Sequence, residues 1–92
     1  MHGRAAFFNA TDIVAIEMQL DAVGKKAALL LGQISSQVIW NDDGSGIVVA
    51  IYDSEASAKA AADSFTEIWG GLMPLLEGAP ETREFAKVHV MK

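Results

Sequence analysis

The C-terminal stretch "REFAKVHVM" (residues 83–91) holds the residue best suited to proton transfer, His89. An unperturbed histidine changes charge close to neutral pH, so its imidazole can both accept and donate a proton. The alternation of this stretch predicts a β-strand with Phe85, Lys87 and His89 on one face and small aliphatic residues on the other. Because the aliphatic face suits packing against helices, His89 is predicted to lie on the opposite face as a catalytic base. The alternative is a half-exposed strand histidine with no chemical role.

Three further polar residues are candidates for ligand binding: Arg4, Asn9 and Lys87. The planar fork of Arg4 suits an anionic or enolate ligand, and Lys87 would add positive charge beside it. Asn9 has an amide that could orient a carbonyl group. The alternatives are an Arg4–carboxylate pair at a subunit rim and a helix-capping role for Asn9.

Two amphipathic aromatic residues, Trp40 and Tyr52, fall on neighbouring predicted strands. Together they could line a cavity for a flat aromatic ligand. Packing in a dimer interface explains them equally well. No metal site is predicted, because His2 and His89 lack further ligands and the chain has no cysteine.

The elements that must position these residues follow the order β-α-β-β-α-β, which is the ferredoxin-like plan. In this α+β plan a four-stranded antiparallel sheet carries both helices on one face. A turn, "NDDGSG", joins the second and third strands into a hairpin, since Asn, Asp and Gly favour tight turns. Residues 1–92 form a single domain, and the expected strands are residues 3–9, 37–40, 46–52 and 83–91.

Each helix is expected to begin at capping residues, one in "NATD" and the other at Asp53 or Ser54 in "DSEASA". In the stretch that follows "NATD", apolar and polar residues alternate at first, which favours a strand. Apolar residues then repeat at three- and four-residue spacing as far as Ile34, which favours a helix. We therefore predict one amphipathic helix over residues 12–34. Gly24 lies inside it and marks where a bend or break is most expected.

The third strand, "GIVVAIY", is apolar on both faces. One face packs on the helices, whereas the other would meet water in a monomer, where a polar surface is usual. A second sheet stacked on the first would bury it, so the sequence predicts a homodimer that pairs its sheet faces.

Composition excludes several classes of function. The net charge of −5 and the scattered basic residues argue against nucleic acid as a partner. No apolar stretch is long enough to span a bilayer, and the N-terminal apolar run is too short for a signal peptide, so no membrane association is predicted. The absence of cysteine is compatible with a cytoplasmic protein.

The hairpin and helix in "DDGSGIVVAIYDSEASAKAA", followed by "LLEGAPETREFAKVHV", resemble the dimeric α/β-barrel superfamily. The similarity is greatest to small proteins grouped with the antibiotic-biosynthesis monooxygenases. It is strongest over residues 38–90 and implies paired sheets that form one barrel. The resemblance also implies an oxygenase that needs no cofactor, in which a deprotonated aromatic, polyketide-type substrate itself reduces oxygen. Family members often use an Asn on the first strand with a Trp and a His, for which this chain offers Asn9, Trp40, Trp69 and His89.

Two functions are carried forward. The first is a cofactor-independent monooxygenase-like enzyme acting on a small aromatic molecule inside a dimer barrel. The second is a non-catalytic ligand-binding, structural or stress-related module with the same dimer, because one fold hosts many functions. A barrel with an open pocket that holds His89 and Arg4 would favour the first, and one filled by Phe, Trp and Met would favour the second.

Overall fold

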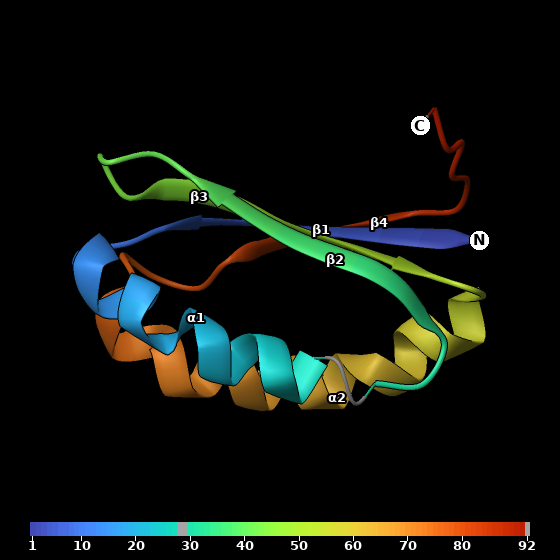
Figure 1. The fold of residues 1–92 in the computed structure, drawn as a ribbon, viewed down its shortest axis with the longest axis horizontal. Helices are drawn as coiled ribbons and strands as arrows, with labels where there is room; N and C mark the ends of the chain where they lie inside the picture. The colour runs from blue at the N-terminus through green and yellow to red at the C-terminus, as the bar shows by residue number, and fades with distance from the viewer. Residues whose placement is uncertain (28–29, 92) are drawn as a thin grey trace.

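The chain forms two layers, a four-stranded antiparallel sheet and two helices that cover one of its faces (Figure 1). The computed structural model describes residues 1–27 and 30–91. The sheet order is β2-β3-β1-β4, which confirms the predicted ferredoxin-like plan. The elements are β1 (His2–Asn9), α1 (Ile13–Ala27), β2 (Gln33–Trp40), β3 (Ser45–Tyr52), α2 (Glu55–Leu72), the short 3-10 helix η1 (Met73–Leu75) and β4 (Glu81–Phe85).

Side-chain caps fix where both long helices begin, as the sequence predicted. Asp12 accepts a hydrogen bond from the backbone N–H of Ala15 at 3.1 Å, which satisfies a free donor in the first turn of α1. At the start of α2, Ser54 accepts from the backbone N–H of Ser57 at 3.1 Å. Asn9 therefore does not cap α1, and its side chain is exposed at the end of β1.

The prediction of one helix to residue 34 is wrong at its C-terminal end. α1 continues through Gly24 without a break but ends at Ala27, and positions 28 and 29 lie outside the described residues. Gly32 adopts a positive φ of 79°, and β2 starts at the next residue. Pairing with β3 along its whole length outweighs the helical spacing of the apolar residues, because each paired residue satisfies backbone donors and acceptors.

The last strand is shorter than predicted. β4 ends at Phe85, which is opposite Gly3 of β1, so almost no partner strand remains for the residues that follow. His89 lies in this following segment, outside any strand, and is exposed. Its predicted position on a strand face is therefore wrong. The segment leaves the sheet on the side away from the helices (Figure 1), where Val88 approaches Gly3.

Alternate residues of β1 and β3 face the helices and form a core that is divided in two. At one end Phe8 packs against Trp69 of α2, with ring centroids 5.9 Å apart. At the other end Tyr52 is fully buried against α2. The two buried clusters are Phe8, Ala10, Ile16 and Leu76, and Ala50, Tyr52, Ala58 and Ala61.

The side of the sheet away from the helices, here called the open face, is covered by no helix (Figure 1) and exposes a large apolar side chain on every strand, beside polar residues such as Glu81 and Arg83. It is represented on the four strands by Phe7, Ile39, Val49 and Phe85, all exposed. Monomeric proteins rarely leave a continuous apolar surface of this kind in water. Neither helix in the described part of the chain has the length and apolarity needed to cross a bilayer.

Candidate functional site

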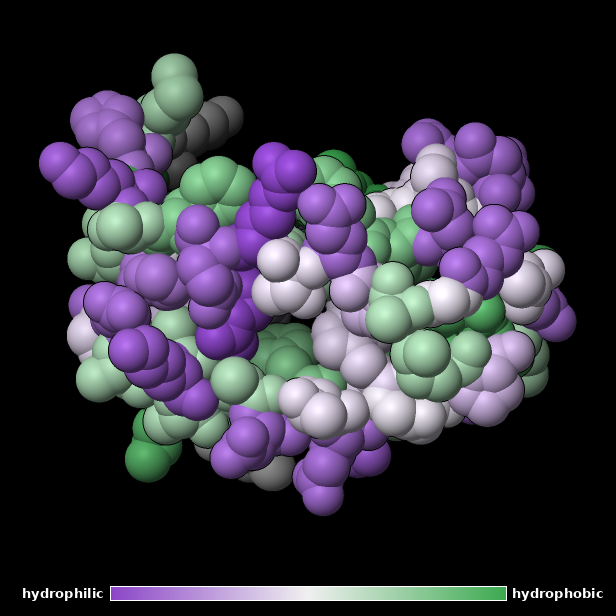
Figure 2. Space-filling view, turned by 180° about the vertical axis from the view of Figure 1, so that it is seen from behind, coloured by the Kyte–Doolittle hydropathy of each residue, from purple (hydrophilic) through white to green (hydrophobic). Residues whose placement is uncertain are grey.

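Between the two buried clusters, the sheet and α2 enclose a hollow of about 260 Å³, here called the polar cavity. Figure 2 shows the molecule hollowed between its two layers, with hydrophobic atoms at the floor of the hollow and hydrophilic atoms on its rim. The lining comes from every strand except β2, together with α2. It consists of Arg4 and Ala6, Val48 and Ala50, Ala62, Phe65, Thr66 and Trp69, and Thr82 and Glu84.

A second hollow of about 160 Å³, the apolar cavity, lies between α1, α2 and the sheet. Val48, Phe65 and Trp69 line both cavities and form the wall between them. The remaining lining of the apolar cavity is mostly aliphatic, including Leu20 and Val23 of α1. The two hollows together offer an aromatic wall, an aliphatic chamber on one side of it and a polar chamber on the other.

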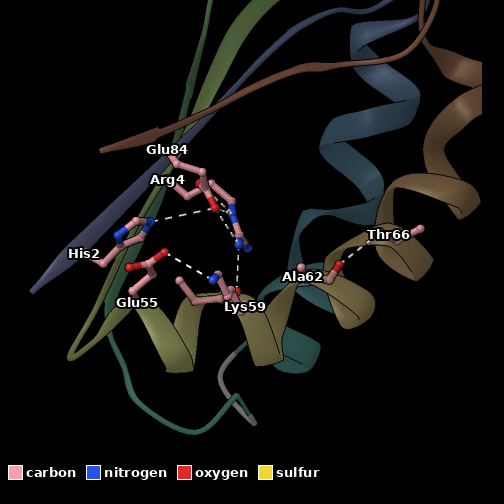
Figure 3. Close-up of polar contacts among 8 residues, drawn as sticks. His2, Arg4, Glu55, Lys59, Ala62, Thr66 and Glu84 are labelled. Carbon is pink, nitrogen blue, oxygen red and sulfur yellow. Dashed lines mark hydrogen bonds and ion pairs between the residues drawn. The ribbon is translucent and has the colours of Figure 1, made fainter. Parts of the chain in front are cut away.

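The polar end is built from Arg4 of β1 and Glu84 of β4, which are directly opposite each other in the sheet. Arg4 Nε donates to both carboxylate oxygens of Glu84 at 3.0 Å, and Nη2 donates to Oε1 at 2.9 Å. Nη2 also donates to the backbone carbonyl of Ala58 on α2 at 2.7 Å. Figure 3 shows this arrangement, in which one guanidinium joins two strands and the helix α2 that packs against them.

His2 lies on the same side of β1 as Arg4, with Nε2 at 3.8 Å from Oε1 of Glu84 (Figure 3). The ring is buried, and Nε2 has no hydrogen-bond partner among the described residues. Sequence analysis considered His2 only as a metal ligand. The two-residue spacing from Arg4, which puts both side chains on one strand face, was the available signal.

Tyr52 lies beside this group, with its ring centroid 5.6 Å from the guanidinium carbon of Arg4. Burial raises the pKa of the Tyr52 hydroxyl, and the nearby positive charge of Arg4 opposes this rise. The hydroxyl has no hydrogen-bond partner among the described residues. The structure therefore brings together two predicted site residues, Arg4 and Tyr52, on the helix-covered face.

The other predicted site residues lie elsewhere. Trp40 donates from Nε1 to Glu17 of α1 at 2.9 Å, at the opposite end of β3 from Tyr52. Trp40 and Tyr52 thus do not line one cavity. Lys87 and His89 are exposed beyond β4. Within residues 1–27 and 30–91, no cluster of three or more His, Asp or Glu side chains could hold a metal ion.

Trp69, by contrast, forms part of the wall of both cavities. The sequence placed it on the buried stripe of α2, and it does pack there against Phe8. Sequence reasoning also missed Glu84, because a carboxylate on a short edge strand gives no signal until its cross-strand partner is known.

No family model matches the chain, and no curated protein sequence matches it. Solved structures do match over nearly the whole length. A candidate antibiotic biosynthesis monooxygenase from Chloroflexus aurantiacus is 20% identical, with a TM-score of 0.75, over 99% of this chain and 96% of that one. A similar candidate from Caulobacter crescentus is 23% identical, with a TM-score of 0.75, over 96% and 90%.

A variant of SnoaB, a cofactor-independent oxygenase from Streptomyces nogalater, is 14% identical, with a TM-score of 0.80, over 98% of this chain and 95% of that one. These identities are low, so the similarity concerns the fold and not the chemistry. The chain therefore has the ferredoxin-like fold of these antibiotic biosynthesis monooxygenase-like proteins.

Proposed function

We propose that the protein is a homodimer that binds a flat, aromatic or polyketide-type small molecule in the polar cavity and oxygenates it without a cofactor. The observation that carries this proposal is the combination, in one hollow, of the Phe65 and Trp69 rings with the Arg4–Glu84 pair. Ligand sites are typically apolar clefts with a few polar groups that set the orientation of the ligand. The polar cavity has this composition.

The chemistry would need little from the protein. Phe65 and Trp69 would hold the ring, and the polar end would hold its oxygen substituents. The deprotonated ligand itself would supply the electrons. An acidic CH₂ group of the ligand would become C=O by gaining one atom of O₂, and the second oxygen atom would leave as water. The apolar side chains that line the polar cavity would limit the access of water to such an anion.

His89, the predicted base, would act only on a ligand held between the two sheets of the proposed dimer, and not on one in the polar cavity. The segment that contains His89 lies on the open-face side of the sheet (Figure 1), whereas the polar cavity of the same subunit lies on the helix-covered side. A catalytic His89 would therefore act inside the sheet-on-sheet interface of a dimer. Substituting it, as His89→Ala, should lower oxygen uptake by about a hundredfold if it is the general base. Unchanged uptake in that variant would remove His89 from the mechanism.

The dimer is proposed from the open face. Burial of the exposed Phe7, Ile39, Val49 and Phe85 against the same surface of a second copy is favourable, because apolar area is removed from water. Two stacked sheets also provide a symmetric, self-complementary contact. Sedimentation at micromolar concentration should give twice the 9.8 kDa chain mass. A stable monomer would contradict this part of the proposal.

A specific observation favours the second candidate, a binding or structural module without chemistry. Both charges at the polar end are already used, since Arg4 joins β1 to β4 and to the backbone of α2. A pair of this kind also stabilises the fold with no ligand present. The module would keep the same cavity and the same dimer.

The decisive experiment titrates a hydroxylated polycyclic aromatic compound and follows tryptophan fluorescence together with oxygen uptake. Binding in the polar cavity should quench Trp69, so Trp69→Phe should lose the quench and the matched variant Trp40→Phe should keep it. Quenching with oxygen uptake supports the enzyme, and quenching without uptake supports the module. Quenching that depends on Trp40 instead would place the ligand elsewhere and contradict both.

A further inference from the structure

Glu84 is the single carboxylate among the described residues that line the polar cavity. A carboxylate offers about four acceptor positions for hydrogen bonds. On Glu84, Oε1 accepts from Nε and Nη2 of Arg4, whereas Oε2 accepts from Nε alone. One acceptor position therefore remains on Oε2. The side chain is 46% exposed, so a ligand in the cavity can reach it.

Arg4 has the opposite accessibility. Its side chain is only 10% exposed, and Nη2 is shared between Glu84 and the carbonyl of Ala58. The remaining nitrogen, Nη1, is buried and has no partner among the described residues. The positive charge of Arg4 thus lies behind Glu84, at 2.9 to 3.0 Å from its carboxylate oxygens. A ligand in the cavity meets a neutralised pair rather than a free cation.

Among the described residues, no other charged group lines the cavity to change this balance. Lys59 and Glu55 form their own pair at 3.3 Å on the exposed surface of α2. Arg83 and Glu81 pair at 3.2 Å on the open face of β4. His2 is near Glu84 but lies outside the cavity lining.

We propose that Glu84 is a specificity-determining residue that makes the polar cavity select a neutral aromatic molecule with a hydroxyl group over an aromatic anion. The ligand hydroxyl donates to Oε2, and the carboxylate cancels the charge of Arg4. An anion of the same shape would meet the carboxylate first and be repelled, and it would also lose its hydration on entry. The inference rests on the proposed function only in using the polar cavity as the ligand site, and it requires no turnover.

The test compares two probes of nearly equal shape, 2-naphthol and 2-naphthoate, by calorimetry at pH 7. The unmodified protein should bind 2-naphthol more tightly. Glu84→Gln removes the negative charge and leaves Arg4 without its counterion, so 2-naphthoate should gain about tenfold or more in affinity while 2-naphthol gains nothing. Solvent exposure of Glu84 keeps the expected effect near tenfold rather than far above it.

Two matched variants keep the inference falsifiable. Glu81→Gln removes a paired carboxylate from the same strand but on the open face, so both affinities should stay unchanged. Glu84→Asp keeps the charge and should keep the preference for 2-naphthol even if Glu84→Gln folds poorly. A preference of the unmodified protein for 2-naphthoate would overturn the inference, as would an unchanged affinity ratio in a folded Glu84→Gln protein.

These affinities, together with the oxygen-uptake assay, separate this inference from the proposed function. If both probes bind with the expected ratio and aromatic substrates consume no oxygen, the oxygenase proposal fails and the selection by Glu84 stands. If neither probe binds, the polar cavity is not a ligand site and both proposals fail.

Discussion

Val48 and Val49 are adjacent in β3 and chemically identical, yet they face different surroundings on the two sides of the sheet. Val48 packs against the buried cluster around Phe8 and lines both cavities. Val49 is 37% exposed on the open face, among other apolar side chains. The comparison shows that an apolar strand face can serve two purposes. One face holds the fold and its cavity together, and the other is the surface that we propose pairs with a second copy of the chain.

The largest effect is expected from introducing a charge on each face in turn. Val48→Asp would bury a carboxylate in the core, and the cost of about 3 kcal/mol or more is a large part of the stability of a small domain. Val49→Asp should keep the folded subunit and disrupt only the proposed dimer. Urea unfolding and sedimentation measure the two results separately. If Val49→Asp unfolds the chain while Val48→Asp leaves it folded, the assignment of the faces is reversed.

Two glycines, one on each face of the sheet, should show the same contrast with a smaller effect on stability. A Cβ at Gly46 would run into the ring of Phe8 and approach the carbonyl oxygen of Ile39 at 2.9 Å. Gly46→Ala should therefore lower the free energy of unfolding by about 1–3 kcal/mol through overpacking.

At Gly3, on the open face, the nearest atom to a new Cβ is Cγ2 of Val88 at 3.5 Å, an ordinary contact. Gly3→Ala should change the free energy of unfolding by less than about 0.5 kcal/mol. Thermal unfolding of both variants checks the contrast. Equal losses would show that the open face is packed as tightly as the helix-covered one.

A small, pH-dependent effect is expected at Tyr52, and it tests how dry the helix-covered face is. Because burial raises the pKa of this hydroxyl, the unfolded chain releases the proton first as the pH rises. This contribution to stability is thus complete below the ordinary tyrosine pKa of about 10 and is lost as the pH rises through the folded-state value.

Tyr52→Phe should remove this loss of stability at high pH and stay within about 1 kcal/mol of the unmodified protein at neutral pH, since the hydroxyl has no partner among the described residues. Denaturant unfolding of both proteins at neutral and at alkaline pH measures these two differences in the free energy of unfolding. If Tyr52→Phe lowers the free energy of unfolding at neutral pH by well above about 1 kcal/mol, the hydroxyl has a hydrogen-bond partner, such as a buried water molecule. The chain has one tyrosine, so its absorbance follows this titration directly.

Sequence patterns predicted the fold well where the cause is local. The turn residues of the hairpin, the caps Asp12 and Ser54 and the apolar stripe of α2 act through neighbours within a few positions. They sufficed for the order of the six elements. The apolar character of both faces of β3 also followed from this strand alone, because alternation assigns its residues to two faces without reference to the rest of the chain.

The candidate site could be predicted only in part. Arg4 was identified as a binding residue with a carboxylate partner as the alternative, and the partner proved to be Glu84. That pairing depends on the register between β1 and β4, which no local pattern sets. The shared cavity of Trp40 with Tyr52 and the strand position of His89 also depended on tertiary structure, since Trp40 contacts Glu17 of α1 and His89 lies beyond the end of β4.

The sequence by itself thus determined the order of the helices and strands and that both faces of β3 would be apolar. Only the tertiary structure decided where α1 gives way to β2, where β4 ends, and which polar groups meet around one hollow. The physical reason is that these outcomes depend on hydrogen bonds and packing between segments far apart in the chain. Arg4 and Glu84 are eighty positions apart, and only the closed sheet puts one opposite the other.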